Sequence, residues 1–238
     1  MKANKWLLCL GIMALFAVLC APKANADLYL ETESISTNVT NRPNSTTTLK
    51  SYYTPTASRW ELGDGKVIIL DYNAVKLFML DPKTKTYREL NLDERPGLPS
   101  TSDAGKQKMM DEANAVASAI QVTPTDETKT IAGYKCRKYN VKLAMSDGEY
   151  WVSDDVTGYQ ELKTLAAKAA SIMDRDPMLK LLNIAGTAEK LDGFPVYTVS
   201  HVMGGTVQRT LKNIEQKPLD SALFKVPKDY TPAQKSHP

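Results

Sequence analysis

Residues 58–90 constrain the fold more than any other stretch, because short strand-like runs alternate there with tight turns. The runs are rich in apolar and β-branched side chains, and the breaks carry Gly, Asp, Asn and Pro. One break is Gly-Asp-Gly at 63–65. Another is Asp-Pro-Lys-Thr at 81–84, which places proline at the second position of a type I turn. Connections this short join antiparallel neighbours, so the segment predicts a meander of hairpins.

The same pattern continues on both sides of the meander. Residues 27–54 are rich in Thr, Ser and Tyr and break once, at Arg-Pro-Asn 42–44, which is typical of two long, partly exposed strands. Further hairpin turns are predicted at Asp147-Gly148 and at Gly204-Gly205, each between β-rich runs. Most of the chain is therefore expected to be antiparallel strand.

Two segments have helical instead of strand periodicity, at about 103–121 and about 159–174. The first apolar stripe comprises Met109, Ala113, Val116 and Ile120. The second comprises Leu162, Leu165, Ala166, Ala169, Ile172 and Met173. Both segments predict amphipathic helices of a little over four turns, and residues 178–184 favour a short third helix.

This order of elements selects the fold class. Two helices among many antiparallel strands cannot supply one crossover per strand, so a parallel doubly wound sheet is excluded. The prediction is an α+β fold: a curved antiparallel sheet, or open half-barrel, with the helices forming a lid on its concave face.

The N-terminus predicts export. Lys2 and Lys5 precede an apolar stretch over 6–21, and Ala-Asn-Ala at 24–26 is a small-x-small cleavage site. The stretch is shorter than the roughly 20 residues that span a bilayer. Residues 1–26 are thus predicted to be a signal peptide, 27–230 a single domain in the periplasm and 231–238 a disordered tail. The alternative is lipid attachment at Cys20, although Leu19 stands where bacterial lipoproteins have a small residue.

Charge and hydropathy exclude two classes of protein. The net charge of +3 comes entirely from the lysines of residues 1–26, and the rest of the chain is balanced. A nucleic-acid binder carries a clustered basic excess, so no nucleic-acid partner is expected. No segment after residue 26 is apolar enough to cross a membrane, so a soluble mature protein is expected.

Few residues point to chemistry. Cys136 is the one cysteine left after cleavage, which excludes an internal disulfide and a cysteine-based zinc site. His201 is in phase with Tyr197, Val199 and Met203, which predicts a partly buried histidine. No calcium loop, nucleotide fingerprint or hydrolase motif occurs, so neither a metal nor a cofactor nor an enzyme is predicted.

Six stretches form a recognisable pattern: 67–71, 76–81, 83–87, 131–139, 149–153 and 223–227. They resemble a family of exported bacterial proteins of unknown function, which is similar to the LolA/LolB-like lipoprotein-carrier superfamily. The resemblance implies a half-closed antiparallel barrel with a helical lid over an apolar cavity that holds acyl chains. In these carriers a basic residue on an early strand ties down the lid, but no motif around Arg59 assigns it that role.

The expected function is a periplasmic binding or carrier protein for a lipid or lipoprotein acyl chain. Strand phase and helical stripe give the expected cavity lining, although either strand phase could face inward. These residues are Val67, Ile69, Leu77, Met79, Met109, Val116, Leu162, Leu165 and Ile172. Two alternatives remain: a sensor or adaptor that binds another envelope protein, and an enzyme that uses Cys136 and His201.

Overall fold

The computed structural model describes residues 27–93, 103–143, 146–176, 179–180 and 190–234. Its strands are β1 (Leu28–Thr37), β2 (Ser45–Tyr53), β3 (Ala57–Glu61), β4 (Val67–Asp71), β5 (Lys76–Asp81), β6 (Thr86–Asn91), β7 (Gln121–Ile131), β8 (Tyr134–Leu143), β9 (Ser146–Ser153), β10 (Phe194–Val202), β11 (Gly205–Gln216) and β12 (Thr231–Pro232). The helices are α1 (Asp103–Ser118), α2 (Tyr159–Met173) and the 3₁₀ helix η1 (Ser221–Phe224).

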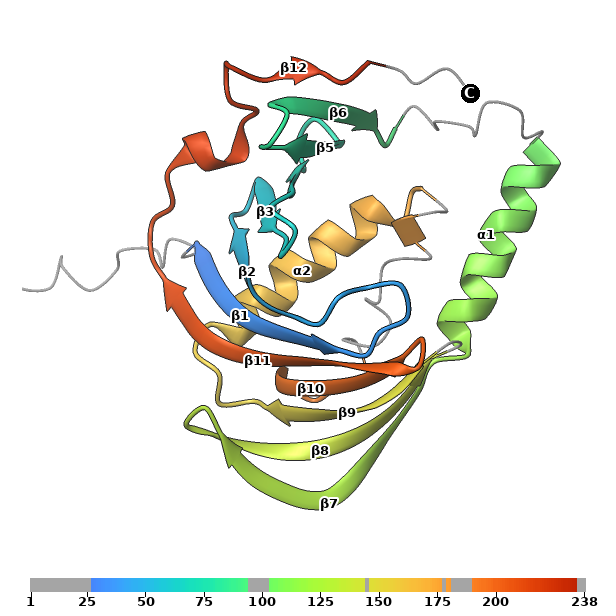
Figure 1. Ribbon diagram of the computed structural model, residues 1–238, viewed down its shortest axis with the longest axis vertical. Coiled ribbons are helices and arrows are strands. Elements are labelled where there is room, and N and C mark those ends of the chain that lie inside the picture. Colours follow the sequence, from blue (N-terminus) through green and yellow to red (C-terminus); the bar gives the residue numbers. More distant parts are fainter. Residues whose placement is uncertain (1–26, 94–102, 144–145, 177–178, 181–189, 235–238) are drawn as a thin grey trace, which may run out of the picture.

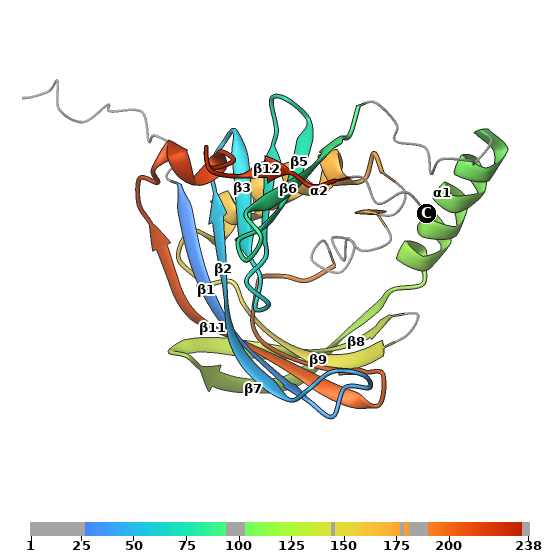
Figure 2. The same cartoon turned by 45° about the horizontal axis from the view of Figure 1, so that its top comes forward.

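The described strands form one sheet in the order β12-β6-β5-β4-β3-β2-β1-β11-β10-β9-β8-β7. All neighbours pair antiparallel except β12 and β6, which are parallel. The sheet curls strongly without closing, because its edge strands β12 and β7 stay apart (Figures 1 and 2). The predicted curved, open antiparallel sheet is therefore confirmed.

The two α-helices differ in where they lie. α2 crosses the concave side of the sheet, whereas α1 stands apart near the far side of the opening (Figures 1 and 2). α2 begins after Gly158, whose φ of 75° favours glycine. A Cβ at this position would also lie 2.7 Å from Leu28 Cδ2, so any larger residue would force the Leu28 side chain to shift.

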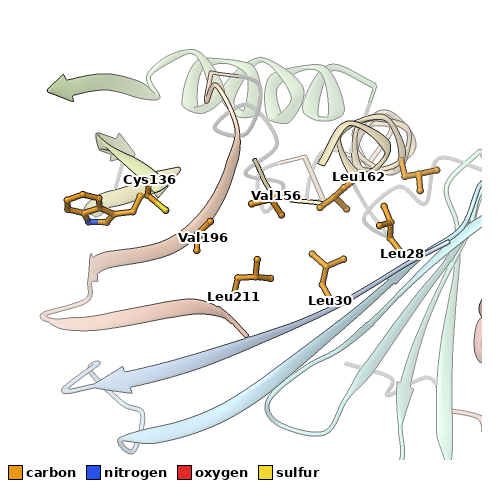
Figure 3. Packing of buried hydrophobic residues seen from close by; sticks show 9 residues of the cluster. Leu28, Leu30, Cys136, Val156, Leu162, Val196 and Leu211 are labelled. Carbon is orange, nitrogen blue, oxygen red and sulfur yellow. The ribbon is translucent and has the colours of Figure 1, made fainter. Parts of the chain in front are cut away.

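The main core lies between α2 and the centre of the sheet. Leu162 and Leu165 of α2 pack with Leu28 and Leu30 of β1 and with neighbouring strands (Figure 3). Fully burying one such side chain contributes about 1.5–3 kcal/mol, which makes this cluster a principal source of stability. Its buried members are Leu28, Leu30, Cys136, Trp151, Val156, Leu162, Leu165, Val196 and Leu211.

The chain from η1 to β12, which we call the C-terminal segment, covers the convex side of the meander. Val67, Ile69 and Leu80 are buried there against Phe224 and Tyr230. Arg59 also lies on this side: its Nη1 donates to the carbonyl of Leu223 at 3.1 Å. Arg59 therefore ties down the C-terminal segment and makes no such bond to α2.

Several local predictions are confirmed. The break at 42–44 lies in the loop between β1 and β2, and the meander has turns at the predicted places. The hairpin before β11 turns at Met203 and Gly204, whose φ values are 49° and 77°, as a two-residue primed turn requires. The signal peptide and most of the predicted third helix lie outside the described residues.

Two predictions were wrong. Asp147-Gly148 is not a turn: both residues lie inside β9, where a Cβ on Gly148 would be 2.1 Å from the carbonyl oxygen of Val199. Gly148 therefore allows β9 and β10 to approach each other closely. The predicted disordered tail also begins too early, because Thr231–Pro232 form β12 and the amide of Ala233 donates to Tyr87.

Candidate functional site

The concave face of the sheet is the candidate site, and strand register shows which side chains belong to it. Side chains alternate between the faces of a strand, and directly paired residues share a face. Leu28, Leu30 and Leu211 pack under α2, so residues in phase with them face inward. α2 packs on one end of strands β1–β5, which we call the covered end; α2 leaves the other end uncovered, and we call it the open end.

The covered end is closed by the second half of α2. Ala169 and Ile172 pack on Leu70 and Leu77, which are 0% and 1% exposed. Lys168 of α2 also holds the helix in place, because its Nζ donates a hydrogen bond to the carbonyl of Pro55 at 2.7 Å. The same ammonium lies 5.1 Å from the ring centre of Tyr72, a favourable cation–π distance.

Two hydroxyls are buried at this covered end. Ser58 and Tyr72 lie within reach of each other, but their side-chain oxygens lack hydrogen-bonding geometry with any described group. Burial raises the pKa of Tyr72 to about 12. It also raises the pKa of Tyr53, whose hydroxyl accepts a 3.0 Å bond from Trp60 Nε1. The covered end is thus an interior in which burial disfavours charge.

At the open end of the same strands, no helix among the described residues packs on the apolar side chains. Ile68 pairs directly with both Trp60 and Met79, so the three form a row across β3, β4 and β5. Leu62 continues the inward phase of Trp60, and Leu49 lies on β2 in the same phase. Leu62 is 37% and Met79 38% exposed. We call Leu49, Trp60, Leu62, Ile68 and Met79 the open apolar face.

The open apolar face continues directly into the core. Trp60 and Ile68 are partly buried against the cluster that contains Leu70, Leu77 and Ile172. An apolar molecule on this face would therefore contact a preformed surface that α2 already holds in place. Contiguous exposed apolar surface marks interaction or ligand sites, whereas apolar side chains scattered singly do not.

The predicted lining residues divide into five groups. Leu77 and Ile172 lie together in the covered end, and Leu162 and Leu165 lie in the main core. All four are buried in protein contacts. Met79 belongs to the open apolar face.

The other predicted lining residues do not join this face. Val67 and Ile69 point to the convex side, because β4 is apolar on both faces and the C-terminal segment buries that side. Met109 and Val116 are on α1, and neither belongs to a buried cluster of the described residues. Val116 is 39% exposed.

Cys136 and His201 do not form a catalytic pair. Cys136 is 1% exposed, its Sγ lies 3.4 Å from the carbonyl of Tyr134, and burial raises the pKa of its thiol. His201, predicted to be partly buried, is exposed beside Asp147 because its end of β10 lies at the rim of the sheet. Across the sheet, His201 pairs with Asp147, which pairs in turn with Lys142 of β8. Cys136 lies six residues from Lys142 along β8, so it is about 20 Å from the level of His201.

A shallow depression of about 800 Å³ lies at the rim, and His201 lines it while Cys136 does not. It is lined by Lys142, Leu143, Ser146, Asp147, His201, Val202, Met203, Gly204, Gly205 and Thr206. Among the residues that the structure describes, no His, Cys, Asp and Glu side chains gather in a group that could hold a metal ion. No helix within the described ranges is long and apolar enough to cross a membrane.

Sequence similarity decides the family. The model of a domain of unknown function, DUF4412, matches residues 40–230. The chain belongs to the DUF4412 family. None of the curated protein sequences matches this DUF4412 chain.

Solved structures with a similar arrangement are distant. A LolA superfamily protein from Nitrosomonas europaea is 8% identical, with a TM-score of 0.33, over 84% of this chain and 90% of that one. The Pseudomonas aeruginosa MucA/MucB complex contains a chain that is 13% identical, with a TM-score of 0.33, over 84% and 56%. PNGF-II is 13% identical with a TM-score of 0.40, and the match covers 88% of the DUF4412 chain but 31% of PNGF-II.

Proposed function

We propose that this DUF4412 protein is a periplasmic binding or carrier protein that holds an acyl chain on the open apolar face. The observation that carries the proposal is the exposure of Met79, in one row with Trp60 and Ile68, and of Leu62, which shares their concave face. Periplasmic location rests on the predicted signal peptide. The protein itself supplies no covalent chemistry in this proposal.

Physical chemistry favours a chain-like apolar ligand. Each buried CH₂ group contributes about 0.8 kcal/mol, so a chain that covers several side chains gains a useful affinity. The face spans several strands on the concave side of the curved sheet and continues toward the end that α2 covers, which suits a long, narrow ligand. Met79 adds a flexible thioether that adapts to an irregular apolar surface.

Titration with a fluorescent fatty acid tests the proposal. We expect the delipidated mature protein to bind with a Kd below about 100 μM, which corresponds to about −5.5 kcal/mol. Met79→Glu should weaken binding about tenfold or more, because the ligand would have to strip water from a carboxylate whose cross-strand neighbour is the exposed Arg88 of β6.

The matched control is Met203→Glu, which changes another exposed methionine at the β10–β11 turn. It should bind like the unchanged protein, and both variants should keep the same melting temperature. Native mass spectrometry of protein purified without detergent adds a second readout. Absence of any co-purified or titrated lipid would contradict the carrier and favour an adaptor that binds another envelope protein.

A further inference from the structure

The two faces of the central sheet differ sharply in charge. Strands β4, β3, β2, β1, β11, β10 and β9 form the centre of the sheet, and register, or for Lys212 its ion pair with Glu33, assigns each of their charged side chains to a face. The flanking strands β5 and β6 differ, because Asp81 and Arg88 share the inward phase of Met79. All their acidic residues have the convex phase. These are Glu31, Glu33, Glu61, Asp71, Asp147, Glu149 and Glu215.

The convex charges are largely paired. Lys50 lies 4.0 Å from Glu31, Arg59 lies 2.9 Å from Glu61, and Lys212 lies 3.1 Å from Glu33. Each of these cations therefore has a carboxylate partner on its own face. The concave face of the same seven strands has no carboxylate to offer.

Arg209 is the one charged side chain that these seven strands place on the concave face. It pairs with Ser34 of β1 and with Thr198 of β10, both in the inward phase. Ser34 pairs in turn with Thr47 of β2, so Arg209 stands in a row of hydroxyls across four strands. Arg209 is exposed, and within the described part of the chain its guanidinium has no ion pair and no hydrogen bond.

This row lies next to the open apolar face. Thr47 and Leu49 are successive inward residues of β2, about 7 Å apart along the strand. Arg209 is two strands from Thr47, about 10 Å across the sheet. One amphiphilic molecule can therefore contact Arg209 at one end and the open apolar face along its chain.

We propose that Arg209, with the hydroxyls of Ser34 and Thr198, binds the anionic head of the amphiphile whose chain lies on the open apolar face. A guanidinium has five donors and no acceptor, and its fork matches a carboxylate or a phosphate. The neighbouring hydroxyls can also donate to such an anion. This inference rests on the proposed function and adds that the ligand carries a negative charge.

Displacement of the neutral dye Nile red from the mature protein tests it with two probes of equal chain length, palmitate and 1-hexadecanol. Palmitate should bind about 10- to 100-fold more tightly, as expected for hydrogen bonds to a charged group. Arg209→Gln should remove this preference and leave hexadecanol unchanged. Lys212→Gln, a loss of positive charge on the same strand but the convex face, should change neither probe.

Lysophosphatidic acid, whose head is a phosphate, is used as a third probe to distinguish a phosphate-binding site from a carboxylate-binding site. A loss of affinity on Arg209→Gln for either anion supports the inference, and the larger loss identifies the preferred head group. Equal affinity for palmitate and hexadecanol, or an unchanged palmitate affinity in Arg209→Gln, would overturn the inference and leave the carrier function standing. If neither probe displaces the dye, both proposals fail.

Discussion

The covered and open ends of strands β3–β5 are built from similar side chains but have different roles. At the covered end Leu70 and Leu77 are almost fully buried under α2, and even the hydroxyl of Ser58 is enclosed. At the open end Met79 and Leu62 keep more than a third of their surface exposed. Stabilisation grows with the apolar area removed from water, so the first set contributes most to stability, and the exposed surface of the second set is available for a ligand.

The largest effect is expected from a pair of substitutions on β5. Leu77→Ala should lower the free energy of unfolding by about 2–5 kcal/mol, because it removes buried methyl groups and leaves a cavity. Met79→Ala, two residues along on the same face, should lower it by less than about 1 kcal/mol. Urea unfolding measures both. Equal losses would show that the two ends are not different.

Alkaline stability distinguishes the covered end next. Because the pKa of Tyr72 is raised from 10 to about 12, its contribution is complete below pH 10 and is lost as the pH rises toward 12. The unfolded chain releases this proton first. Between pH 10 and pH 12, the free energy of unfolding of Tyr72→Phe should therefore fall by about 2–3 kcal/mol less than that of the unchanged protein. Parallel pH curves for the two proteins would contradict the burial of this hydroxyl.

Gly158→Ala tests how α2 is docked. The new side chain would sit at a φ of 75° and 2.7 Å from Leu28 Cδ2, so both strain and a clash oppose it. We expect a loss of about 1–3 kcal/mol. Gly65→Ala is a suitable control, because its φ of 87° imposes the same backbone strain while no atom lies within 4 Å. A similar loss in both variants would mean that the contact with Leu28 contributes nothing.

The smallest effect is expected on α1. Val116→Ser changes an exposed residue outside the buried clusters, so stability should change by at most about 0.5 kcal/mol. Thermal unfolding measures this against Leu165→Ala, the corresponding change in the buried stripe of α2. A loss above about 1 kcal/mol in Val116→Ser would show that α1 is packed on the protein in solution.

Local signals were enough to predict most of the fold. Turns such as 63–65 and 81–84 depend on a few residues, and the stripe of α2 is regular. Strand phase was not predictable for β4, because Val67 to Leu70 is an uninterrupted apolar run and both of its faces are covered. The distinct role of α1 was also hidden, since its stripe resembles that of α2.

The candidate site was harder to predict than the fold. Met79 was identified, but Leu49, Trp60, Leu62 and Ile68 were missed because only the register of four strands brings them together. One signal was present: Trp60 and Leu62 alternate with the charged residues Arg59 and Glu61. Nothing in the sequence around Arg209 identifies it, because its lack of a carboxylate partner depends on the acidic residues of neighbouring strands lying on the convex face.

The most direct test of the open apolar face is NMR of the methionine methyl groups during titration with palmitate. Met79 lies on this face, and the exposed Met203 at the β10–β11 turn serves as the internal reference. We predict a saturable shift of the Met79 methyl signal with no change at Met203. Palmitate binding that leaves the Met79 signal unmoved would contradict the placement of the ligand on the open end of the sheet.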